Sequence, residues 1–188
     1  MLKPNDYEQV KAYGEYKPLR LGGHICKIIK VEETFSRSQR PMLNIYLDIA
    51  DGEQKGYFKN QYDRDDRPDK KWGCIVYQLK RDNEGHTHRG FKTFITCVEK
   101  SNPGFTVVWG DEFSKCFTGK FIGGVFGREQ YRNTYGELKW STKCLNFRSV
   151  ETIRKGVDIP EDKYLKDTAP KAASNDFEEV TGDDELPF

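Results

Sequence analysis

Acidic side chains cluster in the charged run QYDRDDRPDKK, residues 61–71, where a divalent metal could bind. Grouped carboxylates hold Mg²⁺ in enzymes that cleave phosphodiesters, and this run contains Asp63, Asp65, Asp66 and Asp69. Two arginines lie between these acids and offset their charge, which is typical of a hydrated loop. An EF-hand loop starting at Asp63 is excluded because its sixth position, which requires glycine, is proline. A metal-dependent nuclease is therefore the weakest alternative for this chain.

The other catalytic patterns are incomplete. The glycine-rich stretch GKFIGGVFG, residues 119–127, does not match the Walker phosphate loop, because Ser114 and Phe121 replace two of its required residues. Its glycines instead favour a strand that bends tightly or admits a close neighbour. His86 and His88 flank one threonine, but no further metal ligand lies at a fixed spacing from them. We therefore expect no enzymatic activity, no cofactor and no bound metal.

The cysteines favour a reducing compartment. Their number is five, which is odd, and no two of them are close enough in sequence for a C-x-x-C zinc site. Reduced, mostly buried thiols are typical of cytosolic proteins. No apolar run approaches the length of a transmembrane helix, and the first residues lack the layout of a signal peptide. We therefore expect a cytoplasmic protein.

Aromatic and basic side chains are mixed in two segments, KGYFKNQY (55–62) and GREQYRNTYGELKWSTK (127–143). This mixture is typical of proteins that hold single-stranded nucleic acid, because cations neutralise phosphates while flat rings stack on unpaired bases at about 1–3 kcal/mol each. The alternative is that many of these rings pack in or beside the core. From these segments we predict the binding residues Tyr57, Phe58, Lys59, Tyr62, Arg128, Tyr131, Arg132, Lys139, Trp140 and Lys143.

The first half of the chain indicates three strands. A long extended segment is predicted over 19–35, with a Gly-Gly pair where a strand would bend sharply. Apolar and polar residues alternate in MLNIYLDIA, residues 42–50, which predicts a half-buried strand. Tyr46 lies on the polar face of that strand, so we predict it as a further stacking ring. The segment KGYFKN, residues 55–60, is predicted as the third strand.

The second half indicates a helix and a hairpin. WGCIVYQLKR, residues 72–81, fits a strand or a helix equally well. Apolar residues recur at helical spacing over 91–102, and a Pro-Gly pair then ends the helix. The segments 120–132 and 138–150 are joined by a glycine-containing turn and predict a hairpin. Both faces of the second segment carry apolar residues, so the sequence leaves open which face is exposed.

Three strands, a helix and two further strands follow one another as in the OB-fold, a five-stranded barrel. We therefore predict a mostly β protein, an OB-fold barrel with an inserted helix and extra loops; a generic barrel or sandwich is the alternative. The expected domains are an N-terminal arm over 1–18, the barrel over 19–160 and a disordered acidic tail over 161–188. The loop between the first two strands, which flanks the binding face in OB-folds, adds Arg37 and Arg40 to the predicted binding residues.

The net charge of +1 conceals an asymmetry. The chain has 31 basic and 30 acidic residues, of which residues 166–188 hold two and seven. The tail is therefore strongly acidic and the rest of the chain is basic. A basic body joined to an acidic tail is typical of a protein that interacts with charged partners.

The sequence closes on DDELPF, residues 183–188. An apolar ring beside a free carboxylate makes a two-part ligand for an apolar pocket with a basic rim. This ending resembles the acidic tip of bacterial single-stranded DNA-binding proteins, which typically reads Asp-Asp-Asp-Ile-Pro-Phe. The identical positions are Asp183, Asp184, Pro187 and Phe188, and the conservative departures are Glu185 and Leu186.

The resemblance implies a protein that coats single-stranded DNA, without strong sequence preference, during replication, recombination and repair. Its tip would recruit replication and recombination proteins. An OB-fold with such a tip is also similar to the single-stranded DNA-binding proteins encoded by phages, which implies the cytoplasm of a bacterial host. A longer body through 60–105 and the near absence of a Gly/Gln/Pro-rich linker favour a phage or mobile-element member, and they leave a homo-oligomer open. The alternative is an adaptor whose barrel binds protein instead of DNA.

Overall fold

The computed structural model of the chain describes residues 2–9 and 17–165. Of the predicted disordered tail over 161–188, residues 161–165 are described and pair with β4 through Lys163, so this part is ordered. The rest of the tail, with the six residues of the predicted tip, lies outside the described part of the chain. The elements in order are β1 (Gly22–Phe35), β2 (Pro41–Ile49), α1 (Tyr57–Arg64), β3 (Ile75–Leu79), α2 (Arg89–Ser101), the 3-10 helix η1 (Lys115–Phe117), β4 (Phe121–Arg132), β5 (Leu138–Arg148) and α3 (Val150–Lys155). None of the described helices is long and apolar enough to cross a membrane.

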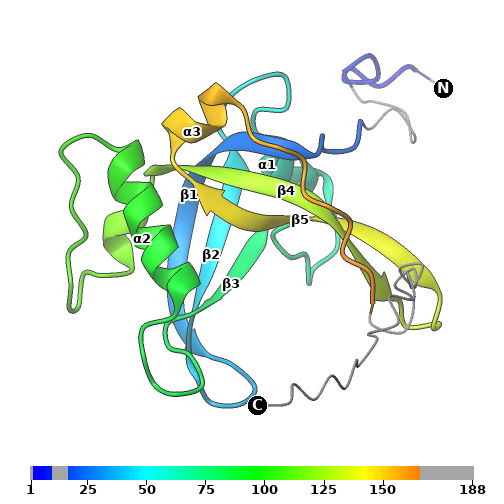
Figure 1. Cartoon of the computed structure of the whole chain (residues 1–188). Coiled ribbons are helices and arrows are strands. Elements are labelled where there is room, and N and C mark those ends of the chain that lie inside the picture. The colour runs from blue at the N-terminus through cyan, green and yellow to red at the C-terminus, as the bar shows by residue number, and fades with distance from the viewer. Residues whose placement is uncertain (1, 10–16, 166–188) are drawn as a thin grey trace, which may run out of the picture.

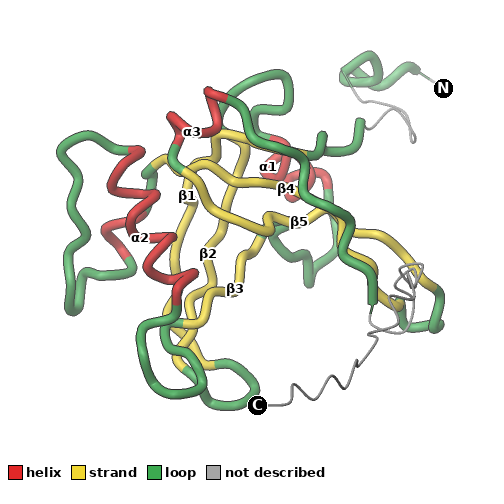
Figure 2. The backbone as a smooth tube through the Cα atoms, viewed as in Figure 1, coloured by secondary structure: helices red, strands yellow, loops and turns green. Residues whose placement is uncertain are grey.

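The five strands form one antiparallel sheet in the order β3-β2-β1-β4-β5. The sheet curls into a barrel-like shape, with α2 along one side and α3 above the crossing of β1 and β4 (Figure 1). Figure 2 shows the same arrangement by element type, with long loops on both sides of α2. The predicted mostly β architecture with five strands is confirmed.

Alternation in β2 fixes which face of the sheet forms the core. Leu43, Ile45, Leu47 and Ile49 are at most 2% exposed, as the sequence predicted. The helix predicted over 91–102 is also confirmed, because α2 covers the same core with its apolar face. Its Phe94 ring lies 5.1 Å from the ring of Phe117 and 5.3 Å from that of Phe147. Each large side chain buried in this way contributes about 1.5–3 kcal/mol.

The third strand predicted over 55–60 is wrong, because this segment begins α1. Gly56 takes a left-handed conformation with φ of 73° and turns the chain away from the sheet. The neighbouring rings of Tyr57 and Phe58 then both pack on the core, which the alternating faces of a strand would not allow. The third strand is instead β3, from the segment that fitted a strand or a helix equally well.

Two adjacent glycines in β4 admit close neighbours, as the sequence predicted. A Cβ on Gly123 would lie 2.8 Å from the carbonyl oxygen of Arg148 and would overlap the side chain of Ile153 in α3. A Cβ on Gly124 would lie 3.1 Å from the sulfur atoms of Cys26 and Cys144. The glycines therefore let β5 and α3 pack directly against β4.

Asp48 is a buried carboxylate that joins β2 to α1. It is 7% exposed, and its Oδ1 accepts hydrogen bonds from the backbone N–H groups of Ile49 and Phe58, both at 2.9 Å. Asp48→Ala leaves these donors without an acceptor, so we expect the free energy of unfolding to fall by about 2–3 kcal/mol in urea titrations. Asp48→Asn keeps an acceptor oxygen and should lose clearly less. Equal losses for the two variants would contradict this role.

Candidate nucleic-acid interface

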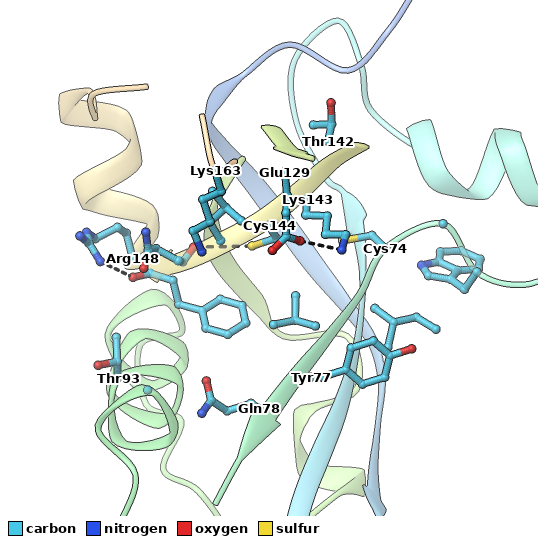
Figure 3. Close-up of a pocket in the computed structure, with 18 of the residues that line it drawn as sticks. Cys74, Tyr77, Gln78, Thr93, Glu129, Thr142, Lys143, Cys144, Arg148 and Lys163 are labelled. Atoms are coloured by element: carbon cyan, nitrogen blue, oxygen red, sulfur yellow. Dashed lines mark hydrogen bonds and ion pairs between the residues drawn. The ribbon is translucent and has the colours of Figure 1, made fainter. Parts of the chain in front are cut away.

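A cleft separates the two ends of the sheet. Within the described residues, β3 pairs with β2 alone and β5 with β4 alone. The two ends approach at Cys74 and Cys144, whose thiols are close enough to interact electrostatically. A cleft of about 890 Å³ lies here, and Figure 3 shows it bounded by β5, β3 and the beginning of α2.

Basic side chains dominate the cleft. Five basic side chains line it, compared with one acidic side chain, Glu129. The five are Lys71, Arg89, Lys143, Arg148 and Lys163. The Lys143 ammonium pairs with Glu129 at 2.6 Å. Within residues 2–9 and 17–165, Lys71, Arg89 and Lys163 make no ion pair. A concave surface with this excess of positive charge attracts an anionic ligand.

Three aromatic rings line the same cleft, the buried Phe147 and the more accessible Trp72 and Tyr77. Tyr77 projects from β3 and is 64% exposed. Trp72 is anchored, because its Nε1 donates a hydrogen bond of 2.7 Å to the carbonyl oxygen of Leu47. Its ring also lies 5.5 Å from that of Tyr62. Rings beside unpaired cations can stack on bases while the cations contact phosphates.

Tyr46 extends this aromatic surface onto β2. The register pairs Tyr46 with Ile75 and Asn44 with Tyr77, so the two tyrosines lie on the same outer face of the sheet. The Tyr46 hydroxyl donates to Glu32 at 2.7 Å, and the Lys30 ammonium lies 4.3 Å from its ring centre. Burial, and then the hydrogen bond to Glu32, raise the pKa of Tyr46 to about 12, so its hydroxyl is neutral at ordinary pH.

The residues predicted on 55–62 have mostly structural positions. Phe58 is 4% exposed and stacks on the core ring of Phe126, so its prediction as a binding residue is wrong. The hydroxyl of Tyr57 accepts a hydrogen bond from the backbone of Leu19. Lys59 is exposed but pairs with Asp63 at 2.5 Å. This segment bears on the cleft through Tyr62, which packs on Trp72.

The residues predicted on 127–143 lie on a projecting hairpin, which we call the β-arm. The predicted hairpin is confirmed, and β4 continues past the start of β1, so the β-arm extends beyond the barrel (Figure 1). Arg128 donates to the carboxylate of Asp162 and lies 5.4 Å from the ring of Trp140. Trp140 in turn meets Tyr164 edge-on at 5.1 Å. A segment of the chain that follows α3 therefore holds both Arg128 and Trp140.

The sequence left open which face of the segment 138–150 is exposed, and in the β-arm both faces carry exposed rings. Tyr131 and Trp140 lie on opposite faces of the arm and are 42% and 39% exposed, so neither face is buried. The guanidinium of Arg132 donates to a carbonyl oxygen in the turn, and Lys139 pairs with Glu137. Lys143 is the one predicted binding residue that lines the cleft.

The predicted loop arginines lie at another edge of the molecule. Arg37 is exposed, and Arg40 hydrogen-bonds to the side chain of Asn83, which ties the loop 36–40 to the loop 80–88. In Figure 1 these loops lie well apart from the tip of the β-arm. The loop 36–40 therefore does not lie beside the turn of the β-arm.

Sequence reasoning missed most of the cleft. The residues not foreseen are Lys71, Trp72, Tyr77, Arg89, Arg148 and Lys163. The Lys-Lys-Trp run at 70–72 also places cations next to an aromatic ring, so the sequence does indicate this part of the nucleic-acid interface. The exposed position of Tyr77 follows from alternation once β3 is known to be a strand. The remaining three cations come from separate elements and have no local signal.

The described residues contain no group of three or more His, Cys, Asp or Glu side chains that could hold a metal ion. In the acidic run, Asp65 pairs with Arg67 at 2.7 Å. All five cysteines are free thiols, and burial raises the pKa of Cys26 well above its ordinary value.

No protein-family model matches the chain, and no curated protein matches it at a significant level.

Proposed function

We propose that this chain binds single-stranded DNA, with little sequence preference, in the cleft between β3 and β5. The observation that carries the proposal is the lining of that cleft, where five cations face one acid beside the rings of Trp72 and Tyr77. Cations of this kind neutralise phosphates whatever the sequence, and rings stack on any unpaired base. The binding surface continues over Tyr46 on the outer face of β2.

The topology supports an OB-fold as the finer description of the barrel. A helix lies between the third and fourth strands, and β1 pairs with both β2 and β4. The gap between β3 and β5 corresponds to the partly open side of such a barrel. We propose an OB-fold in which this gap is part of the DNA site.

The acidic tip is proposed to recruit replication and recombination proteins of a bacterial host. Its support is the sequence DDELPF, in which an apolar ring follows three acids. As part of the same proposal, the chain is encoded by a phage or another mobile element. Coating of exposed strands and recruitment of partners would then be performed by separate parts of the chain.

A competition between single strands and duplex tests the DNA-binding proposal. Duplex bases are already stacked on one another, so they are not available to Trp72 and Tyr77. We expect at least tenfold tighter binding of oligo-dT of about 16 nucleotides than of duplex of equal length, measured by fluorescence anisotropy. Binding should weaken with salt, with a slope of about −0.7 in log K per phosphate contact. Equal affinity for duplex, or no binding of either single strand or duplex, would overturn the proposal. The second result would favour the alternative, an adaptor whose barrel binds protein.

A further inference from the structure

The exposed side of α2 carries a basic stripe next to the cleft. Side chains three, four or seven positions apart lie on one side of a helix, and on α2 this side holds Arg89, Lys92, Thr93, Thr96 and Lys100. Glu99 lies at its edge, where its carboxylate accepts a hydrogen bond from the backbone of Val107. A second hollow of about 630 Å³ lies along this side, lined by Thr87, Arg89, Lys92, Thr93, Thr96 and Cys97. This lining contains no acidic and no aromatic side chain. It therefore favours phosphates over bases.

The hollow is continuous with the cleft. Arg89 and Thr93 line both, and Figure 3 shows Thr93 on the helix at the edge of the cleft. Burial raises the pKa of Cys97, and the nearby charges of Arg148 and Lys100 oppose that shift. A cation of the cleft and a cation of the stripe therefore both act on the same thiol, and Lys100 also interacts with the carboxylate of Glu151 in α3.

The cations of the stripe are available to a ligand. Within the described part of the chain, Arg89, Lys92 and Lys100 make no ion pair. The hydroxyl of Thr96 lies between them on the same side of the helix and can donate to a phosphate oxygen. Lysine, arginine and threonine side chains are the groups that hold the sugar-phosphate backbone without reading its sequence.

We propose that the stripe on α2 is a second phosphate-binding segment, which holds the backbone of a DNA strand as it leaves the cleft. The proposal rests on the proposed function of the cleft. In this division, the cleft contacts bases through its rings and phosphates through its cations. The stripe contacts phosphates alone. A short strand fills the cleft, whereas a longer strand reaches both segments. The contribution of the stripe therefore depends on the length of the strand.

The double variant Lys92→Gln, Lys100→Gln tests this division. It should weaken binding of oligo-dT of about 16 nucleotides by roughly three- to tenfold and leave oligo-dT of about 5 nucleotides unchanged. For the longer strand, the slope of log K against log salt should become shallower by about 1.4, since two phosphate contacts are lost. The control is Lys27→Gln, Lys55→Gln, which removes the same charge from exposed positions outside both linings and should bind like the unaltered chain.

The outcomes separate the two proposals. If the unaltered chain binds neither strand, the proposed function and the stripe fail together. If it binds both, and the α2 variant matches the control with the longer strand, the stripe is refuted while the cleft stands. An equal loss with both strand lengths also refutes the stripe as a separate segment, because the two lysines would then act on the cleft itself.

Discussion

Replacing Lys71, Arg89 and Lys163 together by glutamine should weaken binding of oligo-dT on the order of a hundredfold at low salt. These three cations line the cleft from three separate parts of the chain and make no ion pair with a described acid. Each is expected to release one counterion from the DNA, so the salt slope should become shallower by about 2. Anisotropy titrations at several salt concentrations give both quantities.

A charge-preserving triple variant is the matched control. Lys71→Arg, Arg89→Lys and Lys163→Arg keep all three positive charges and should retain most of the affinity, because phosphate neutralisation depends mainly on charge. The three side chains are exposed, so neither variant should lose much stability, and urea denaturation checks this. Unchanged DNA affinity in the glutamine variant would place the DNA elsewhere on the molecule.

Removing Asp183–Phe188 should abolish capture of replication and recombination proteins from a bacterial extract, while the affinity for oligo-dT is kept or increases. The tip is proposed to supply the ring that docks on a partner, and its three acids no longer oppose the DNA phosphates once it is deleted. Immobilised chain, with and without the tip, gives the capture result. Anisotropy of the same two proteins gives the DNA result.

Phe188→Ala is the sharper variant for the tip. It keeps the three acids and removes one ring, whose burial in a partner is worth about 1.5–3 kcal/mol, or roughly ten- to a hundredfold in affinity. DNA binding by this variant should equal that of the unaltered chain. Capture that persists at full strength after deletion of the tip would refute the tip as the docking element.

Strong local periodicity made parts of the fold predictable. The alternation in residues 42–50 fixed β2 and its buried face, and the helical spacing of residues 91–102 fixed α2. In KGYFKN the local pattern predicted a strand, but a helix forms. Gly56 turns the chain and Asp48 accepts a hydrogen bond from the backbone of Phe58, and the second contact comes from outside the segment. Secondary structure in short aromatic segments is decided by such tertiary contacts.

The candidate site was predictable in chemistry but not in place. Cations mixed with aromatic rings were foreseen, yet Arg128 and Trp140 are held by Asp162 and Tyr164. The cleft forms because β3 and β5 are the two ends of one curled sheet, which is a property of strand order. Residues brought together by strand order alone, such as Lys71 and Lys163, have no common signal in the sequence.

Photo-crosslinking with peptide mapping shows whether single-stranded DNA lies in the cleft between β3 and β5. Oligo-dT that carries 5-iododeoxyuridine at single positions would be irradiated with the full chain, and the cross-linked residues identified by mass spectrometry. A strand held in the cleft places bases against Trp72, Tyr77 and the neighbouring Tyr46, so we expect cross-links at these rings. Cross-links confined to Tyr131, Tyr135 and Trp140 of the β-arm would contradict it.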